Sequence, residues 1–125
     1  MAKQRMQEAQ REQRIDMEIV VDAYGAQEQA MSWYYYLEEN LEFLFAAKCI
    51  AVRAISPLEI GDEVEVIGMP PEAECEHEMF VSIAQGRKGL AVPLSQLEVA
   101  KSVSNETLQA VEDWHYWLAQ GYEFG

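Results

Sequence analysis

Carboxylate side chains gather in two short stretches of this sequence, and the first is Glu38-Glu39-Asn40 with Glu42 just beyond. It follows a segment with a helical pattern. The carboxyl end of a helix carries about half a negative charge and leaves carbonyl oxygens without intrahelical partners. Acids are unfavourable there unless a hard cation neutralises them, and calcium takes about six to eight oxygen ligands of these kinds. A solvated helix end without a metal is the alternative interpretation.

The second stretch is PPEAECEHEMF, in which four glutamates alternate along seven residues. If this segment is extended, all four side chains point to one side, because side chains alternate along a strand. Their mutual repulsion would then favour a divalent cation, although a solvated loop remains the alternative. The two stretches together predict metal ligands at Glu38, Glu39, Asn40, Glu72, Glu74, Glu76 and Glu78.

Other polar groups give weaker signals. The run Gly61-Asp62-Glu63, with Glu65, fits a turn followed by the solvent face of a strand. Cys75 and His77 suggest zinc, but their spacing is not a standard zinc signature. EF-hand loops, phosphate-binding glycine motifs and hydrolase nucleophile motifs are absent from the sequence. We therefore do not expect an enzyme, and a metal-dependent hydrolase is the least supported alternative.

Charge is the most informative feature of the composition. The 125 residues include 22 acids and 9 bases, for a net charge of −13, and half of them are hydrophobic. Residues 1–14 hold four bases and two acids, which leaves 5 bases and 20 acids, a net charge of −15, for residues 15–125. We expect one domain over 15–125 that repels nucleic acid and anionic membranes and attracts cations.

The chain termini and the cysteines suggest a cellular location. Residues 1–14 are polar and predict a flexible or helical arm rather than the apolar segment of a signal peptide. The sequence has no apolar run of the roughly 20 residues that span a bilayer. Its two cysteines, Cys49 and Cys75, are too few for a disulfide framework. We expect a cytoplasmic protein with reduced thiols.

Apolar periodicity predicts the elements that carry the acids. Residues 15–24 alternate imperfectly and predict a short strand, which Gly25 ends. Residues 26–41 predict a helix, and residues 104–120 predict a second helix that Ser104 caps. The expected faces are Ala30, Tyr34, Leu37 and Leu41 for the first helix, and Leu108, Val111, His115 and Leu118 for the second.

Residues 46–94 predict strands at AKCIAVRAI, EVEV, MFVSIA and LAVPL, with QGRKG as a tight turn. In the second of these, Val64 and Val66 should face the core while Glu63 and Glu65 face solvent. Short strands at this spacing indicate an α+β fold. We expect a small SH3-like β-barrel of about five short strands, flanked by the two helices.

Several of these runs together resemble one family. EQAMSWYYYLEENLEF, AKCIAVRAISPLEIGDEVEVIGM, ECEHEMFV and EDWHYWLAQGYEF are similar to the small cyanobacterial calcium-binding proteins of the CcbP type. The resemblance implies a calcium buffer or sequestering protein that is not an EF-hand, linked in filamentous relatives to calcium control of heterocyst differentiation. It places Glu38-Glu39 on the family's acidic pair and residues 72–78 on its acid-rich loop.

A metal-free interaction module is the competing hypothesis. The acidic face of an SH3-like domain could bind a basic protein partner, whose identity the sequence does not give. Six aromatic residues supply possible contact surface, although packing in the core is the other explanation for them. These residues are Trp33, Tyr34, Tyr35, Tyr36, Trp114 and Trp117.

Overall fold

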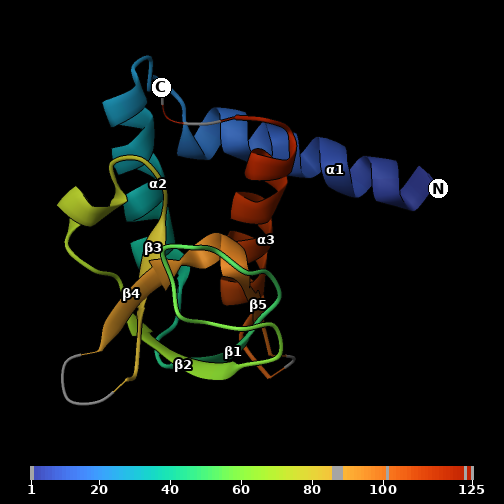
Figure 1. The fold of residues 1–125 in the computed structure, drawn as a ribbon. Helices are drawn as coiled ribbons and strands as arrows, with labels where there is room; N and C mark the ends of the chain where they lie inside the picture. The colour runs from blue at the N-terminus through green and yellow to red at the C-terminus, as the bar shows by residue number, and fades with distance from the viewer. Residues whose placement is uncertain (1, 86–88, 101, 123, 125) are drawn as a thin grey trace.

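The computed structural model describes residues 2–85, 89–100, 102–122 and 124. It has an α+β fold in which helices pack with a five-stranded antiparallel sheet (Figure 1). The helices are α1 (Ala2–Arg14), α2 (Ala26–Asn40) and α3 (Asn105–Ala119), with short helical turns η1 (Ile15–Ile19), η2 (Glu72–Cys75) and η3 (Leu94–Gln96). The strands are β1 (Phe45–Cys49), β2 (Glu63–Gly68), β3 (Phe80–Ile83), β4 (Leu90–Pro93) and β5 (Leu97–Val99).

The strand order is β4-β3-β2-β1-β5, and every neighbouring pair is antiparallel. In the part of the chain that the structure describes, β4 and β5 form the two edges and do not pair. The sheet is therefore not closed into a barrel, and the expected SH3-like barrel is not confirmed: the chain leaves β4, passes through η3 and reaches the opposite edge without forming a ladder between the edges. The expected alternation in β2 is confirmed, because Val66 is buried while Glu63 and Glu65 are exposed.

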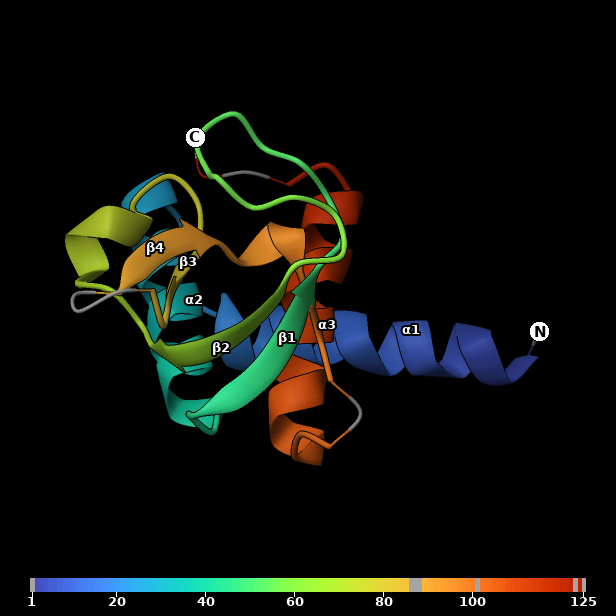
Figure 2. The same cartoon turned by 60° about the horizontal axis from the view of Figure 1, so that its bottom comes forward.

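The helices α2 and α3 contact each other beside the sheet (Figure 2), and tryptophan side chains fill the space between them. Trp33 on α2 lies edge-on to Trp114 on α3, with ring centroids 5.1 Å apart. Trp117 stacks beside Trp114, and all three side chains are buried. Tyr34 is buried as well, and Tyr35 is the exposed member of the aromatic run. Core packing is thus what most of these aromatic residues do.

The buried faces predicted for α2 and α3 agree with the structure to different degrees. On α2, Ala30, Tyr34, Leu37 and the following Leu41 are buried, so that face is confirmed. On α3 the expected face is confirmed only in part: Val111 is buried, but Leu108 is exposed, and Trp114 and Trp117 turn the neighbouring face toward the core. The expected cap is confirmed: the Ser104 hydroxyl accepts a hydrogen bond from the Thr107 backbone amide.

The strand expected at residues 15–24 is also wrong. The chain continues from α1 into η1, a single π-helical turn, and Ile15 and Ile19 are both buried. Their four-residue spacing places them on one side of a helix, which decides the local conformation. The expected QGRKG turn falls largely outside the described residues. None of the described helices is long and apolar enough to cross a membrane.

Candidate metal centre

The carboxyl end of α2 presents oxygen atoms of several kinds. Leu41 adopts an extended conformation and ends the helix, and its amide still donates to the Leu37 carbonyl at 2.8 Å. The next amide, that of Glu42, donates instead to the Thr107 hydroxyl on α3 at 2.9 Å. The Glu38 carbonyl therefore loses its usual intrahelical donor. Glu38 and Glu39 are exposed beside it.

Asn40 is the last residue of α2 and folds back onto the helix. Its side-chain amide nitrogen donates to the Tyr36 carbonyl at 2.8 Å. This bond uses the donor end of the side chain, so the amide oxygen is the end available as a ligand. Asn40 can thus add a neutral oxygen next to the two carboxylates.

The second acidic stretch is not extended, so its four glutamates do not share one side in the way that an extended segment would place them. Pro71 precedes η2, a 3₁₀ turn in which the Glu74 amide donates to the Pro71 carbonyl at 2.9 Å. Cys75 turns inward and is fully buried, and the Phe80 amide donates to its sulfur at 3.4 Å. The glutamates at 72, 74 and 76 all remain exposed. Pro71 is the residue just before this turn, and because proline has no amide to donate to a ladder, it disfavours a paired strand at this point.

Two tyrosines join η2 to α2. The Tyr34 hydroxyl donates to the Pro70 carbonyl at 2.6 Å, and the Tyr35 hydroxyl donates to a carboxylate oxygen of Glu72. This hydrogen bond is the main cause that raises the pKa of Tyr35 above its ordinary value, and the charge of Glu38 adds to it. Burial chiefly raises the pKa of Tyr34, again with a contribution from Glu38. Glu38 and Glu72 therefore share one neighbourhood.

Glu78 is separated from this group by an ion pair that the sequence did not reveal. Its two carboxylate oxygens accept from the two terminal nitrogens of Arg53, at 2.7 and 2.8 Å. The Ser95 hydroxyl also donates to it at 3.2 Å. The bond to Glu78 raises the pKa of Arg53 further. Because Arg53 lies 25 residues earlier in the chain, spacing gave no sign of the pair.

The predicted ligands do not form an assembled cage. Among the described residues, no three histidine, cysteine, aspartate or glutamate side chains are placed to hold one metal ion. The chemistry of the donors nevertheless suits calcium, since carboxylate, amide and carbonyl oxygens all lie at the α2 end. The cysteines weighed as zinc ligands, Cys49 and Cys75, are both buried. The exposed glutamates would have to move to share an ion.

Comparison with known proteins identifies the family of this chain. A family model described as calcium binding, that of the CcbP proteins, matches residues 13–118. The chain belongs to the CcbP family of calcium-binding proteins. The resemblance found in the sequence is thereby confirmed, and Ca²⁺ is the ligand of this family.

Two solved structures resemble this CcbP-family chain over nearly its whole length. The crystal structure of Anabaena CcbP is 42% identical, covers 93% of this chain and 94% of its own, and superposes with a TM-score of 0.81. A calcium-binding protein solved in its calcium-binding form is also 42% identical, over 92% of this chain and 94% of its own, with a TM-score of 0.79. A comparison with curated proteins found no match.

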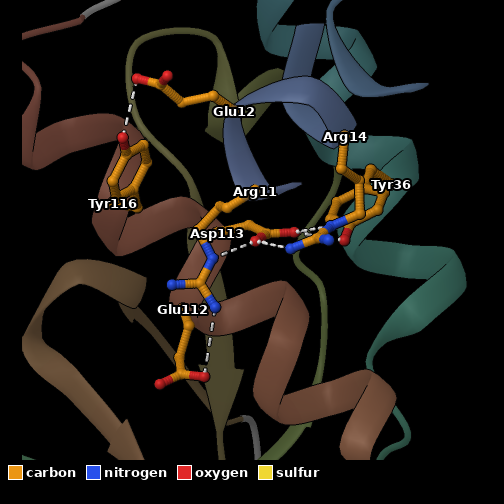
Figure 3. Close-up of polar contacts among 7 residues, drawn as sticks. All are labelled: Arg11, Glu12, Arg14, Tyr36, Glu112, Asp113 and Tyr116. Atoms are coloured by element: carbon orange, nitrogen blue, oxygen red, sulfur yellow. Dashed lines mark hydrogen bonds and ion pairs between the residues drawn. The ribbon is translucent and has the colours of Figure 1, made fainter. Parts of the chain in front are cut away.

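A second polar cluster, which the sequence analysis missed, surrounds Asp113 on α3 (Figure 3). This carboxylate is fully buried, and it accepts hydrogen bonds from the Arg11 Nε at 2.8 Å and from two nitrogens of Arg14 at 2.6 and 2.9 Å. The Tyr36 hydroxyl on α2 donates to it at 2.7 Å. The arginines lie 102 and 99 residues from Asp113, too far apart for spacing to reveal them.

The Asp113 cluster is structural rather than a metal site. Its carboxylate already has two cationic partners, so a metal ion would have to displace them. The bonds tie α1, α2 and α3 together, and on α2 they reach Tyr36, two residues before Glu38. Burial, followed by the bond to Asp113, raises the pKa of Tyr36 to about 12.

Proposed function

We propose that this chain binds calcium between the carboxyl end of α2 and the η2 segment, and that it serves as a calcium buffer. The hydrogen bond from Tyr35 to Glu72 carries the proposal, because it brings the second acidic stretch against the first. The proposed ligands are Glu38, Glu39, Asn40, Glu72, Glu74 and Glu76. Glu78 is not among the proposed ligands, since its carboxylate forms an ion pair with Arg53.

The proposed ligands are of two chemical kinds, charged carboxylates and neutral oxygens. The glutamates would supply the negative charge that a doubly charged ion requires, and Asn40 together with the Glu38 carbonyl would supply neutral oxygens. Tyr34 and Tyr35 would position η2 against α2 and would not themselves be ligands. Bound calcium would also relieve the unfavourable placement of Glu38 and Glu39 at a negative helix end.

Exposed acids that are not pre-assembled predict a modest affinity for calcium. Such ligands must be ordered when the ion binds, and this cost lowers the affinity. Solvent and salt also screen their charges, so binding should weaken at high ionic strength. The excess of acids, 22 against 9 bases, would keep the local calcium concentration high. We place this activity in the cytoplasm, and in filamentous relatives it would bear on heterocyst differentiation.

Calorimetric titration with calcium tests the proposed site. We expect the wild-type chain to bind calcium and the double substitution Glu38→Gln with Glu39→Gln to weaken binding about tenfold or more, since each change removes a full ligand charge. Glu28→Gln is the matched control, because Glu28 is an exposed acid in the first turn of the same helix. If the control, which removes one charge instead of two, lowered the free energy of binding by about half as much as the double variant, net charge, and not this site, would govern binding.

A further inference from the structure

A groove of about 720 Å³ lies between α3, β5 and the last turn of α1. Its apolar lining includes Val99 from β5, Leu108 and Val111 from α3, and Ile50 just after β1. Leu108 is 39% exposed and Ile50 is 44% exposed. Large apolar side chains open to solvent in one hollow are typical of a surface that binds another protein segment.

The charged groups at this groove favour a basic occupant. Glu98 and Glu112 line it together with Arg11 and His115. Arg11 is already bound to Asp113, and the His115 ring is bonded to the Leu97 carbonyl at 2.8 Å. Arg11 also lies 3.6 Å from Glu112, so Glu98 is the more available charge at the groove, and the chain as a whole carries a net charge of −13.

The first half of α1 extends away from the sheet and the other helices (Figures 1 and 2). In Figures 1 and 2, α1 runs past α3 and its N-terminal half projects beyond the rest of the fold. Residues 7–10 are exposed, and the polar contacts of α1 with α3 come from Arg11, Glu12 and Arg14 in its last turns. Isolated helices of this length are only marginally stable in water, so a covering surface would stabilise it.

We propose that the groove binds the N-terminal arm of a second copy of this chain. Residues 1–7 contain Lys3 and Arg5 but no acid, and they also contain Met6, an adaptable apolar side chain. Basic and apolar residues on the arm thus match acidic and apolar residues at the groove. The arm also precedes residue 13, where the match to the family begins. Association through it is therefore a property of this chain beyond calcium binding.

Exchange of the two arms between two copies would give a symmetric dimer to which no third copy can add. The groove borders the last turn of α1, so the two arms can cross side by side, each lying in the groove of the other copy. Residues 2–10 as a helix span roughly 13 Å, which is enough to lie along several turns of α3. Such a two-fold exchange uses the same surface on both copies and ends at a dimer.

Sedimentation of the full chain over a wide concentration range, up to millimolar, tests the proposal. We expect a reversible dimer that weakens with added salt. Deleting residues 2–9, which keeps Arg11 and Arg14, should give a monomer whose circular dichroism spectrum loses only the helical signal of the deleted residues and whose thermal unfolding stays cooperative. Lys3→Glu with Arg5→Glu should weaken dimerisation about tenfold, and adding Glu98→Lys to that same chain should restore much of it.

A second pair of variants tests whether the groove itself is the binding surface. Leu108→Glu should abolish the dimer, whereas Ile55→Glu should leave it intact, since Ile55 is 62% exposed on the loop between β1 and β2 and does not line the groove. A wild-type chain that stays monomeric up to millimolar concentration would overturn the proposal. So would a dimer that survives deletion of the arm, which keeps the test decisive even if Leu108→Glu fails to fold.

Discussion

Asp113 is a buried carboxylate whose charge is balanced by two guanidinium groups and a phenol. Charge-assisted hydrogen bonds of this kind are about twice as strong as neutral ones, and a bidentate arginine fixes geometry as well. The arginines are 24% and 20% exposed, whereas Asp113 is fully buried. The stabilisation therefore depends on Asp113 keeping both partners in place.

Replacing Asp113 should reveal this dependence. In Asp113→Asn the two arginines lose their charge partner, and we expect the free energy of unfolding to fall by about 3 kcal/mol, as when one member of a buried pair is removed. Urea denaturation measures it. Glu112→Gln is the control: Glu112 is 51% exposed and 3.6 Å from Arg11, so a change within about 0.5 kcal/mol is expected. Equal effects would mean that the cluster adds little.

The raised pKa of Tyr36 predicts how the stability of the fold changes at alkaline pH. It lies against Asp113 from α3 and Arg14 from α1, and its pKa is raised to about 12 from an ordinary value of 10.0. The folded state therefore holds this proton more tightly than the unfolded state. The resulting stabilisation is complete below pH 10 and is lost as the pH rises from about 10 to about 12. Urea denaturation of Tyr36→Phe should show a shallower loss over this range; an unchanged slope would contradict the assignment.

Tyr35 should report directly on the proposed calcium ligand Glu72. The hydrogen bond and the negative charge of that carboxylate raise the Tyr35 pKa. If Glu72 binds calcium, both influences weaken and the pKa should fall toward its ordinary value. NMR titration of ring-labelled tyrosine, with and without calcium, measures this change. Glu72→Gln should produce the same fall without calcium, and a Tyr35 pKa indifferent to saturating calcium would exclude Glu72 as a ligand.

At the scale of elements, short-range signals predicted what local chemistry decides. Helices at 26–40 and 105–119 follow from apolar spacing and from the Ser104 cap, and β2 follows from its alternation. The errors came where a competing constraint won. Ile15 and Ile19 fit a helical side as well as a strand, and the alternating glutamate run, which follows Pro71, forms the turn η2.

The cap on α3 gives an element-scale test. The Ser104 hydroxyl accepts from the Thr107 amide at 3.2 Å and donates to the Thr107 hydroxyl at 2.9 Å. We expect Ser104→Ala to lower the free energy of unfolding by about 1 kcal/mol, the usual effect of removing such a cap. Ser102→Ala serves as the control, since Ser102 is exposed and precedes the cap. Equal melting temperatures for the two variants would show that packing of the tryptophans alone holds the helix.

At the scale of the whole molecule, the sequence predicted the class of fold and the family, but not how distant segments meet. The pairs Arg53–Glu78 and Arg14–Asp113 join residues 25 and 99 positions apart, and no local pattern encodes either one. The meeting of η2 with α2 through Tyr34 and Tyr35 is likewise tertiary. Charge composition indicated a cation-binding protein. The individual ligands stay predictions, because exposed side chains take up their ligand positions only when the ion binds.

The most direct measurement is an NMR titration of the backbone amides of the full chain with calcium. If calcium binds between the end of α2 and η2, the largest shifts will fall within residues 35–42 and 70–78. The other acidic run, residues 59–65, serves as an internal control and should shift little. Shifts centred on residues 59–65, or spread evenly over all exposed acids, would contradict the proposed site.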